Sequence, residues 1–125
     1  MPGSRGQAGR VRIFGQYGWL DQREATDSVS VNVVISFQAL PGRAAELLPL
    51  LREGRDISRS ADGCESFELF QRGDDESRFM FLETWSSIED HHRNMADNIV
   101  ASGHLLRILP LIAGPPDNGV IQLVD

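Results

Sequence analysis

Residues 29–39, VSVNVVISFQA, alternate between apolar and polar side chains along most of their length. This period of two is typical of a β-strand whose two faces have different surroundings. One face carries Val29, Val31, Val33, Ile35 and Phe37, and the other carries Ser30, Asn32, Ser36 and Gln38. The regular part of the chain therefore begins with a strand that has one apolar face.

A helix and then a β-hairpin are predicted after this strand. Residues 43–61 carry an apolar stripe at helical spacing, formed by Leu47, Leu50, Leu51, Ile57 and Ala61. Pro49 lies within the stripe, so the helix should kink there or begin late. CESFELFQ (64–71) and RFMFLETW (78–85) have strand patterns, and the turn residues 73–76 between them predict a hairpin.

A second helix and a fourth strand complete the pattern. Ser86 or Ser87 is the expected N-cap of a helix that begins at Ile88. Gly103 interrupts this helix, and a helical apolar pattern resumes after it. The C-terminal GVIQLVD has a strand pattern. The order β-α-β-β-α-β over residues 29–125 predicts an α+β, ferredoxin-like fold with a four-stranded antiparallel sheet.

The N-terminal residues differ from the rest. Residues 1–28 contain five glycines and four arginines and show little periodicity, which is typical of an extension. We therefore divide the chain into an N-terminal arm, residues 1–28, and one domain, residues 29–125. The large apolar residues of the arm are expected to dock on the domain or on a partner subunit; they are Phe14, Tyr17, Trp19 and Leu20.

Composition excludes several classes of protein. Lys and Arg total 12 against 18 Asp and Glu, for a net charge of −6, which argues against nucleic acid as a partner. The single cysteine, Cys64, excludes an internal disulfide and a multi-cysteine metal site, and fits a reducing cytoplasm. The sequence has no apolar run long enough for a membrane helix and no secretory signal pattern. We expect a cytoplasmic protein.

The predicted strand 78–85 is apolar on both faces. Phe79, Phe81 and Trp85 point one way, while Met80 and Leu82 point the other. Two helices can cover only one face of a four-stranded sheet. The second face therefore predicts a homodimer with sheet packed against sheet. The alternative is that the N-terminal arm alone covers that face.

The pattern Glu-x-Trp at a strand end, a histidine near the start of the next helix, and Pro-Gly after the first strand together resemble the antibiotic biosynthesis monooxygenase family. The resemblance covers about residues 31–125. It implies a dimeric α+β barrel with a pocket between sheet and helices in each subunit. Characterised members of the family include cofactor-independent oxygenases of phenols and quinols, haem-degrading enzymes and isomerases of small signalling molecules.

Glu83 and Trp85 share a strand face with Phe81. A carboxylate among aromatic side chains is costly unless it is paired. Glu83 is therefore interpreted either as a proton carrier or an orienter of a substrate hydroxyl, or as a structural partner of an arginine. Trp85 is either a core anchor at the strand–helix corner or a wall of an aromatic substrate site.

Two adjacent histidines lie near the start of the predicted second helix. Relative to a stripe set by Ile88, Met95 and Ile99, His91 lies about 60° to one side and His92 about 40° to the other. Both are candidate bases, with His91 preferred because the family resemblance places a polar pocket residue near this point. Each has the alternative of a purely structural role.

The same helix is a poor candidate for a metal site. Ligands on one helix normally sit at i and i+4, and four residues after the two histidines the chain has Met95 and Ala96. No metal is expected. Asn98 falls on the same flank as His91 and could orient a substrate oxygen.

His104 follows the Gly103 break, near the position where haem-degrading relatives carry an iron-ligating histidine. Those relatives also have an asparagine in the first strand and a tryptophan in the second helix, and the aligned residues here are Ile35 and Asn94. The resemblance therefore does not favour haem degradation. Asn32 lies on the less apolar strand face and is expected to line the pocket or the dimer barrel.

The sequence and the resemblance together predict a cofactor-independent monooxygenase that oxidises a phenolic, hydroquinone or polyketide-like aromatic with O₂. A histidine base would remove a phenolic proton, and the anion would reduce O₂ directly. No Gly-x-Gly-x-x-Gly nucleotide fingerprint follows a strand, so no cofactor is expected. Phe81, Met95 and Leu106 are expected to shape the pocket, with His104 nearby. The alternatives are an isomerase of a small metabolite and a non-catalytic binding dimer.

Overall fold

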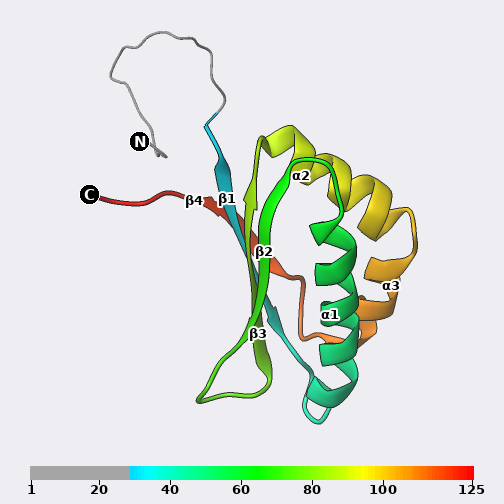
Figure 1. Ribbon diagram of the computed structural model, residues 1–125. Coiled ribbons are helices and arrows are strands. Elements are labelled where there is room, and N and C mark those ends of the chain that lie inside the picture. Colours follow the sequence, from blue (N-terminus) through cyan, green and yellow to red (C-terminus); the bar gives the residue numbers. More distant parts are fainter. Residues whose placement is uncertain (1–28) are drawn as a thin grey trace, which may run out of the picture.

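The computed structural model describes residues 29–125 of the protein. Its elements, in chain order, are β1 (Val31–Gln38), α1 (Ala44–Arg59), β2 (Cys64–Gln71), β3 (Arg78–Trp85), α2 (Ile88–Asn94), the π-helix η2 (Met95–Val100), α3 (His104–Ile108), the 3₁₀ helix η3 (Leu109–Leu111) and β4 (Asp117–Ile121). The helices lie together on one side of the sheet (Figure 1). The arm, residues 1–28, and its predicted docking lie outside the described residues.

The four strands form one antiparallel sheet in the order β2-β3-β1-β4. The central strands β1 and β3 pair with Ile35 opposite Phe81 and Val33 opposite Glu83. Residues directly opposite one another share a face, so Glu83 lies among the apolar residues that face the helices. The predicted ferredoxin-like order β-α-β-β-α-β is confirmed. None of the helices in residues 29–125 is long and apolar enough to cross a membrane.

Two predicted boundaries are wrong, and one of the two alternatives for Pro49 is excluded. Val29 is exposed and precedes β1, so it does not belong to the buried strand face. Helix α1 begins at Ala44, well before Pro49, and does not begin late. Strand β4 covers Asp117–Ile121 instead of 119–125. Ile121 pairs with Asn32, next to the first residue of β1, so the residues after Ile121 have almost no strand left to pair with.

Small residues complete the buried stripe of α1. The buried residues of this helix are Leu47, Leu51, Gly54 and Ser58, which follow one another at spacings of three and four residues. The predicted stripe included Ile57 and Ala61 instead, and both of these are only half-buried. Gly54 has no side chain beyond a hydrogen and Ser58 has a small one, so these two positions leave space between α1 and the sheet.

The second helix changes its winding partway along. Ser87 is its N-cap, with the side-chain oxygen accepting a hydrogen bond from the Asp90 backbone N–H at 3.1 Å. From Met95 onward it is a π-helix, in which each turn takes more residues than an α-helical turn. The α-helical projection therefore loses its phase from Met95 onward, which affects Met95 and Ile99 of the reference stripe but not the two histidines before it. His91 is buried, whereas His92 is exposed.

The other face of the sheet is not covered by any helix of residues 29–125 (Figure 1). Its central side chains are Val34, Met80 and Leu82, which are half-buried. At its two edges Phe70 and Ile121 are exposed. We call the residues Val34, Phe70, Met80, Leu82 and Ile121 the outer face.

Candidate functional site

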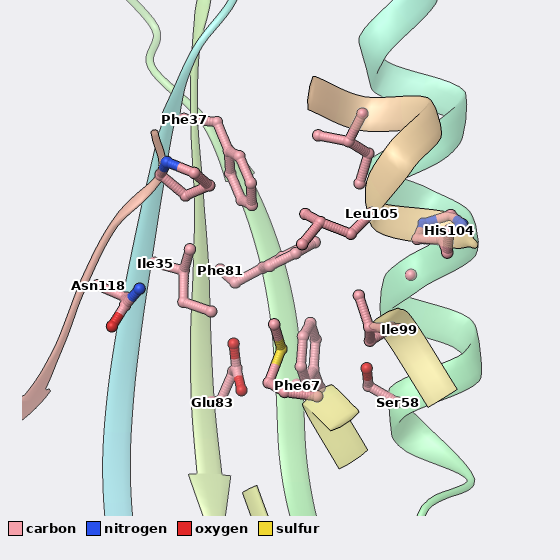
Figure 2. A pocket seen from close by; sticks show the side chains of 14 residues that line it. Ile35, Phe37, Ser58, Phe67, Phe81, Glu83, Ile99, His104, Leu105 and Asn118 are labelled. Atoms are coloured by element: carbon pink, nitrogen blue, oxygen red, sulfur yellow. The ribbon is translucent and has the colours of Figure 1, made fainter. Parts of the chain in front are cut away.

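A cavity of about 180 Å³ lies between the sheet and the helices (Figure 2). Side chains from β1, β2 and β3 form one wall, and α1, η2 and α3 form the opposite wall. The lining residues are Ile35, Phe37, Gly54, Ser58, Phe67, Phe81, Glu83, Met95, Ile99, His104, Leu105, Ile108, Pro116 and Asn118. Most of these side chains are apolar, as in ordinary small-molecule sites.

Three phenylalanines on the sheet build the aromatic wall of the cavity. The ring centroids of Phe67 and Phe81 are 4.7 Å apart with the planes at 61°, and those of Phe37 and Phe81 are 5.3 Å apart at 81°. These edge-to-face arrangements are the favoured geometry for aromatic pairs. The wall is held by the same contacts that hold the core, so its shape is set before any ligand arrives.

Glu83 is the acidic residue of the cavity. It is only 1% exposed, and its Oε1 accepts a hydrogen bond of 2.8 Å from the Trp85 indole Nε1–H. Its Oε2 is buried and has no hydrogen-bond partner within residues 29–125. Because a buried carboxylate oxygen without a donor is costly, this atom is a ready acceptor for a ligand. The partner of Glu83 is an indole, not the arginine considered from the sequence.

His91 stands behind Glu83. Its Nδ1 is 3.3 Å from Glu83 Oε1, within ion-pair range, although the geometry does not make a hydrogen bond. The His91 ring is tilted against Trp85, with centroids 5.8 Å apart, and against the exposed His92, at 5.6 Å. His91 does not line the cavity. His91 could therefore act on a substrate only through Glu83. His92 is exposed and does not line the cavity either.

His104 lines the cavity from the first turn of α3. Its Nε2 is 2.9 Å from the backbone oxygen of Leu50, and since a carbonyl can only accept, Nε2 carries the hydrogen. Its Nδ1 lies 3.8 Å from the Glu53 carboxylate. The ring fits closely over Gly54, where a Cβ would come within 3.1 Å of Nε2. The helix α1 glycine therefore makes room for the imidazole.

The remaining residues predicted for the site lie elsewhere. Asn98 does not line the cavity; its Nδ2 donates to Asn94 Oδ1 at 2.8 Å, and Asn94 Nδ2 donates to Ser58 Oγ at 2.9 Å. Asn32 is on the outer side of the sheet, where it accepts a hydrogen bond from Thr84. Trp85 is fully buried behind Glu83 and contacts the site through that residue.

The prediction of Leu106 as a shaping residue is wrong. Leu106 is 70% exposed, and its neighbour Leu105 lines the cavity instead. The direction of this short helix is set by the left-handed Gly103 before it, with φ at 84°, so it could not be projected from the preceding helix. The structure does place Phe81, Met95, Glu83 and His104 on the cavity.

Several lining residues were not identified from the sequence as site residues. Gly54 and Ser58 had a signal, because they continue the Leu47 and Leu51 stripe at helical spacing. Ile99 was assigned only to the buried stripe. Other lining residues, such as Pro116 and Asn118, lie in irregular or edge segments for which the sequence carries no directional signal. Within residues 29–125, no group of three or more His, Cys, Asp or Glu side chains comes together as a metal site.

Comparisons with known proteins agree with this architecture. Residues 30–97 match the family model described as antibiotic biosynthesis monooxygenase. No curated protein has a significant match to the sequence.

Three solved structures illustrate the similarity. Rv0793 from Mycobacterium tuberculosis has a TM-score of 0.68 and 21% identity, covering 78% of this chain and 97% of its own. PA3566 from Pseudomonas aeruginosa has a TM-score of 0.67 and 22% identity, covering 81% and 100%. SnoaB from Streptomyces nogalater, a cofactor-independent oxygenase, has a TM-score of 0.65 and 15% identity, covering 77% and 94%.

At these identities the structural matches establish the fold alone. The family model, however, spans more than half of the chain, including β1, the β2–β3 hairpin and the Glu83–Trp85 corner. The protein therefore belongs to the antibiotic biosynthesis monooxygenase family.

Proposed function

We propose that this protein is a cofactor-independent oxygenase that converts a phenol to a quinone with O₂. The observation that carries the proposal is the unpartnered Glu83 Oε2, which lies in an otherwise largely apolar cavity lined by phenylalanines. A phenolic O–H supplies the donor that this oxygen lacks, and its ring matches the aromatic wall. Family membership and the description of SnoaB as a cofactor-independent oxygenase support the same reaction class.

The reaction needs no external electrons. Glu83 Oε2 accepts the phenolic proton, and the electron-rich phenolate transfers electrons to O₂. A bond then forms between oxygen and the ring carbon para to the hydroxyl, and the O–O bond breaks. One oxygen atom becomes the second quinone carbonyl, and the other leaves as water with the two protons lost by the phenol. The phenol supplies all four electrons that O₂ takes up.

The residues around Glu83 support this role in different ways. Trp85 fixes one carboxylate oxygen by its 2.8 Å hydrogen bond and leaves the other free. His91, 3.3 Å from Oε1, can balance the charge of the carboxylate and is a positioning residue, since it does not reach the cavity. The apolar walls exclude water from the phenolate and from reduced oxygen. His92, the second candidate base, has no part in this scheme.

We also infer that the active form is a homodimer. The outer face is apolar, with Phe70 47% and Ile121 42% exposed at its edges and the half-buried Val34, Met80 and Leu82 between them. Exposed apolar patches of this kind usually mark a protein–protein contact. Packing two copies face to face buries both patches by one two-fold axis. The alternative occupant of this face is the N-terminal arm.

The test is oxygen consumption by purified protein with a panel of phenols and hydroquinones, under air and under nitrogen. Glu83→Gln should lower kcat/KM for oxygen uptake roughly 10²- to 10⁴-fold, the usual contribution of a general base. Leu106→Ala, an exposed position outside the cavity, is the matched control and should leave the rate unchanged. His91→Asn should reduce the rate less than Glu83→Gln.

The outcomes separate three functions. Oxygen uptake that depends on Glu83 supports the oxygenase. Turnover that proceeds equally under nitrogen would replace it with an isomerase that uses the same carboxylate. Saturable binding without turnover of any compound in the panel would leave a non-catalytic binding dimer.

A further inference from the structure

The size of the cavity limits the substrate. A dry apolar cavity of about 150 Å³ accepts one benzene molecule, and the cavity here is about 180 Å³. The additional space corresponds to a small substituent. A system of three or four fused rings would not fit within this volume and would have to extend outside it.

The walls are not free to move apart. Ile35, Phe37, Phe67, Phe81 and Ile108 line the cavity and are also buried members of the hydrophobic core. Because protein cores are close-packed, separating these side chains to admit a second or third ring would break the contacts that hold the helices on the sheet. Asn118 on the edge strand β4 is the exposed residue of the lining, and Met95, Leu105 and Pro116 are half-buried. A group that extends outward from the cavity would pass these residues.

The polar atoms that line the cavity determine where a polar group of the ligand can bind. Ser58 Oγ already accepts a hydrogen bond from Asn94. His104 Nε2 bonds the Leu50 carbonyl, and its Nδ1 lies toward Glu53. Within residues 29–125, His104 Nδ1 and Glu83 Oε2 are both buried without a hydrogen-bond partner. Because His104 Nδ1 lies toward the Glu53 carboxylate, we take Glu83 Oε2 as the acceptor for a ligand. Figure 2 shows the Glu83 carboxylate beside apolar and aromatic side chains.

We infer that the substrate is a phenol with a single ring, a small apolar substituent and an unsubstituted para carbon, bound with its hydroxyl on Glu83 Oε2. The single ring follows from the volume, and the hydroxyl follows from Glu83 Oε2, a buried acceptor without a hydrogen-bond partner in residues 29–125. The free para carbon rests on the proposed function, because that carbon receives the oxygen atom. For 2-methylphenol the balanced reaction with one O₂ gives methyl-1,4-benzoquinone and water.

The first experiment measures binding without turnover. Isothermal titration under nitrogen compares 2-methylphenol, 1-naphthol and anthracen-1-ol, which share a hydroxyl with a free para carbon and differ in the number of rings. Saturable binding is expected for 2-methylphenol, weaker binding for 1-naphthol, and no displacement of 2-methylphenol by anthracen-1-ol. Ile99→Ala removes a lining side chain and should strengthen the binding of 1-naphthol, while Leu106→Ala should not.

The second experiment tests the hydroxyl. The methyl ether 2-methylanisole has the same ring and no donor, so it should bind roughly 10- to 100-fold more weakly than 2-methylphenol, as expected for loss of a hydrogen bond to a charged group. In Glu83→Gln, the amide oxygen should remain with the Trp85 N–H, leaving the amide NH₂ to face the cavity. This variant should bind phenol and ether with similar affinity.

Two results would overturn the inference: tighter binding of anthracen-1-ol than of 2-methylphenol, or equal binding of phenol and ether by the unmodified protein. Failure of the proposed function looks different. If the ring-size order and the Glu83-dependent hydroxyl preference hold under nitrogen but no oxygen is consumed in air, the binding specificity stands and the oxygenase does not. Oxygen uptake with fused-ring phenols alone would keep the oxygenase and reject the single-ring substrate.

Discussion

The two faces of the sheet are built from the same strands but have opposite properties. On the face toward the helices, β3 buries Phe79, Phe81, Glu83 and Trp85. On the outer face the alternate residues Met80 and Leu82 are only half-buried. Successive side chains of a strand point to opposite sides, so eight residues of one strand supply both a site wall and a patch that no described helix covers.

The difference shows where this fold can carry a charged group. On the inner face, the buried Glu83 carboxylate is stabilised by the hydrogen bond from Trp85 and by the nearby His91. Its second oxygen has no hydrogen-bond partner in residues 29–125 and can accept one from a ligand. On the outer face the polar residues satisfy one another, as Thr84 does by donating to Asn32. The proposed ligand site and the proposed dimer contact therefore lie on opposite faces of the same sheet.

The largest expected effect compares aromatic residues on the two faces. Trp85→Ala should cost about 3–5 kcal/mol of unfolding free energy, because Trp85 is fully buried and its loss leaves a void. Phe70→Ala should cost less than about 1 kcal/mol, since Phe70 is 47% exposed. Urea denaturation at low protein concentration measures both. Equal losses would show that the outer face is packed as tightly as the core.

A charge on the outer face should weaken the proposed dimer. Leu82→Arg places a guanidinium at the centre of that face, on β3 between β2 and β1, and should weaken a dimer by more than about 100-fold, since an unpaired interfacial charge costs several kcal/mol. Light scattering across a dilution series gives the mass.

The control for this variant is Leu106→Arg, which makes the same change on the exposed side of α3 and should leave the mass unaltered. If the unmodified protein is a monomer at every concentration, the dimer is wrong and the N-terminal arm becomes the candidate cover. A chain of residues 29–125 alone should still form the dimer. Its failure to do so would also point to the arm.

A smaller effect on stability is expected from removing the N-cap of helix α2. Ser87→Ala removes the N-cap that accepts from Asp90 N–H and should lower the unfolding free energy by about 1 kcal/mol. Ser86→Ala is the matched control. The Ser86 hydroxyl donates to Glu65 at the surface, so removing it should change the unfolding free energy by less than about 0.5 kcal/mol. Thermal denaturation distinguishes them. The reverse order would place the cap at Ser86.

The smallest effect concerns Cys64, which lies opposite Trp85 in the sheet register. Burial raises the pKa of the Cys64 thiol, and the negative charge of Glu83 raises it further. A raised folded-state pKa favours the neutral thiol, so its contribution to stability is complete below the unfolded pKa and is lost as the pH rises through the folded pKa.

The rate of alkylation by iodoacetamide as a function of pH should therefore have a higher midpoint in the native protein than in urea. Glu83→Gln removes one negative charge and should move the native midpoint downward. A midpoint unaffected by this variant would show that the thiol does not sense the inner-face carboxylate.

The sequence alone was sufficient for the order of elements and for most strand positions. Alternation in 31–38 and 78–85 is a local property, since each side chain faces opposite to its neighbour whatever the rest of the chain does. It identified Glu83 and Phe81 as sharing one face, and the helix start at Ile88 followed from the capping serines before it. The break at Gly103 was equally local, as its φ of 84° confirms.

The site depended on information that is not local. The sequence preferred His91 over His92 but could not show that His91 is buried outside the cavity, behind Glu83. The buried stripe used for the comparison included Met95 and Ile99, which lie in a π-helix. Leu105 lines the cavity in place of the predicted Leu106, because a left-handed glycine sets the direction of α3. After each change of backbone winding, the later side chains no longer follow the regular projection.

The sequence by itself determined a ferredoxin-like domain with a carboxylate on an aromatic strand face. Only the tertiary structure decided that a cavity stands before that carboxylate, because the cavity is the space left where Gly54 and Ser58 of α1 face Phe81 and Glu83 of β3. These residues are far apart in the chain, and no local pattern reports the distance between them. Packing of the helix on the sheet sets that distance, and with it the size of the ligand the site can hold.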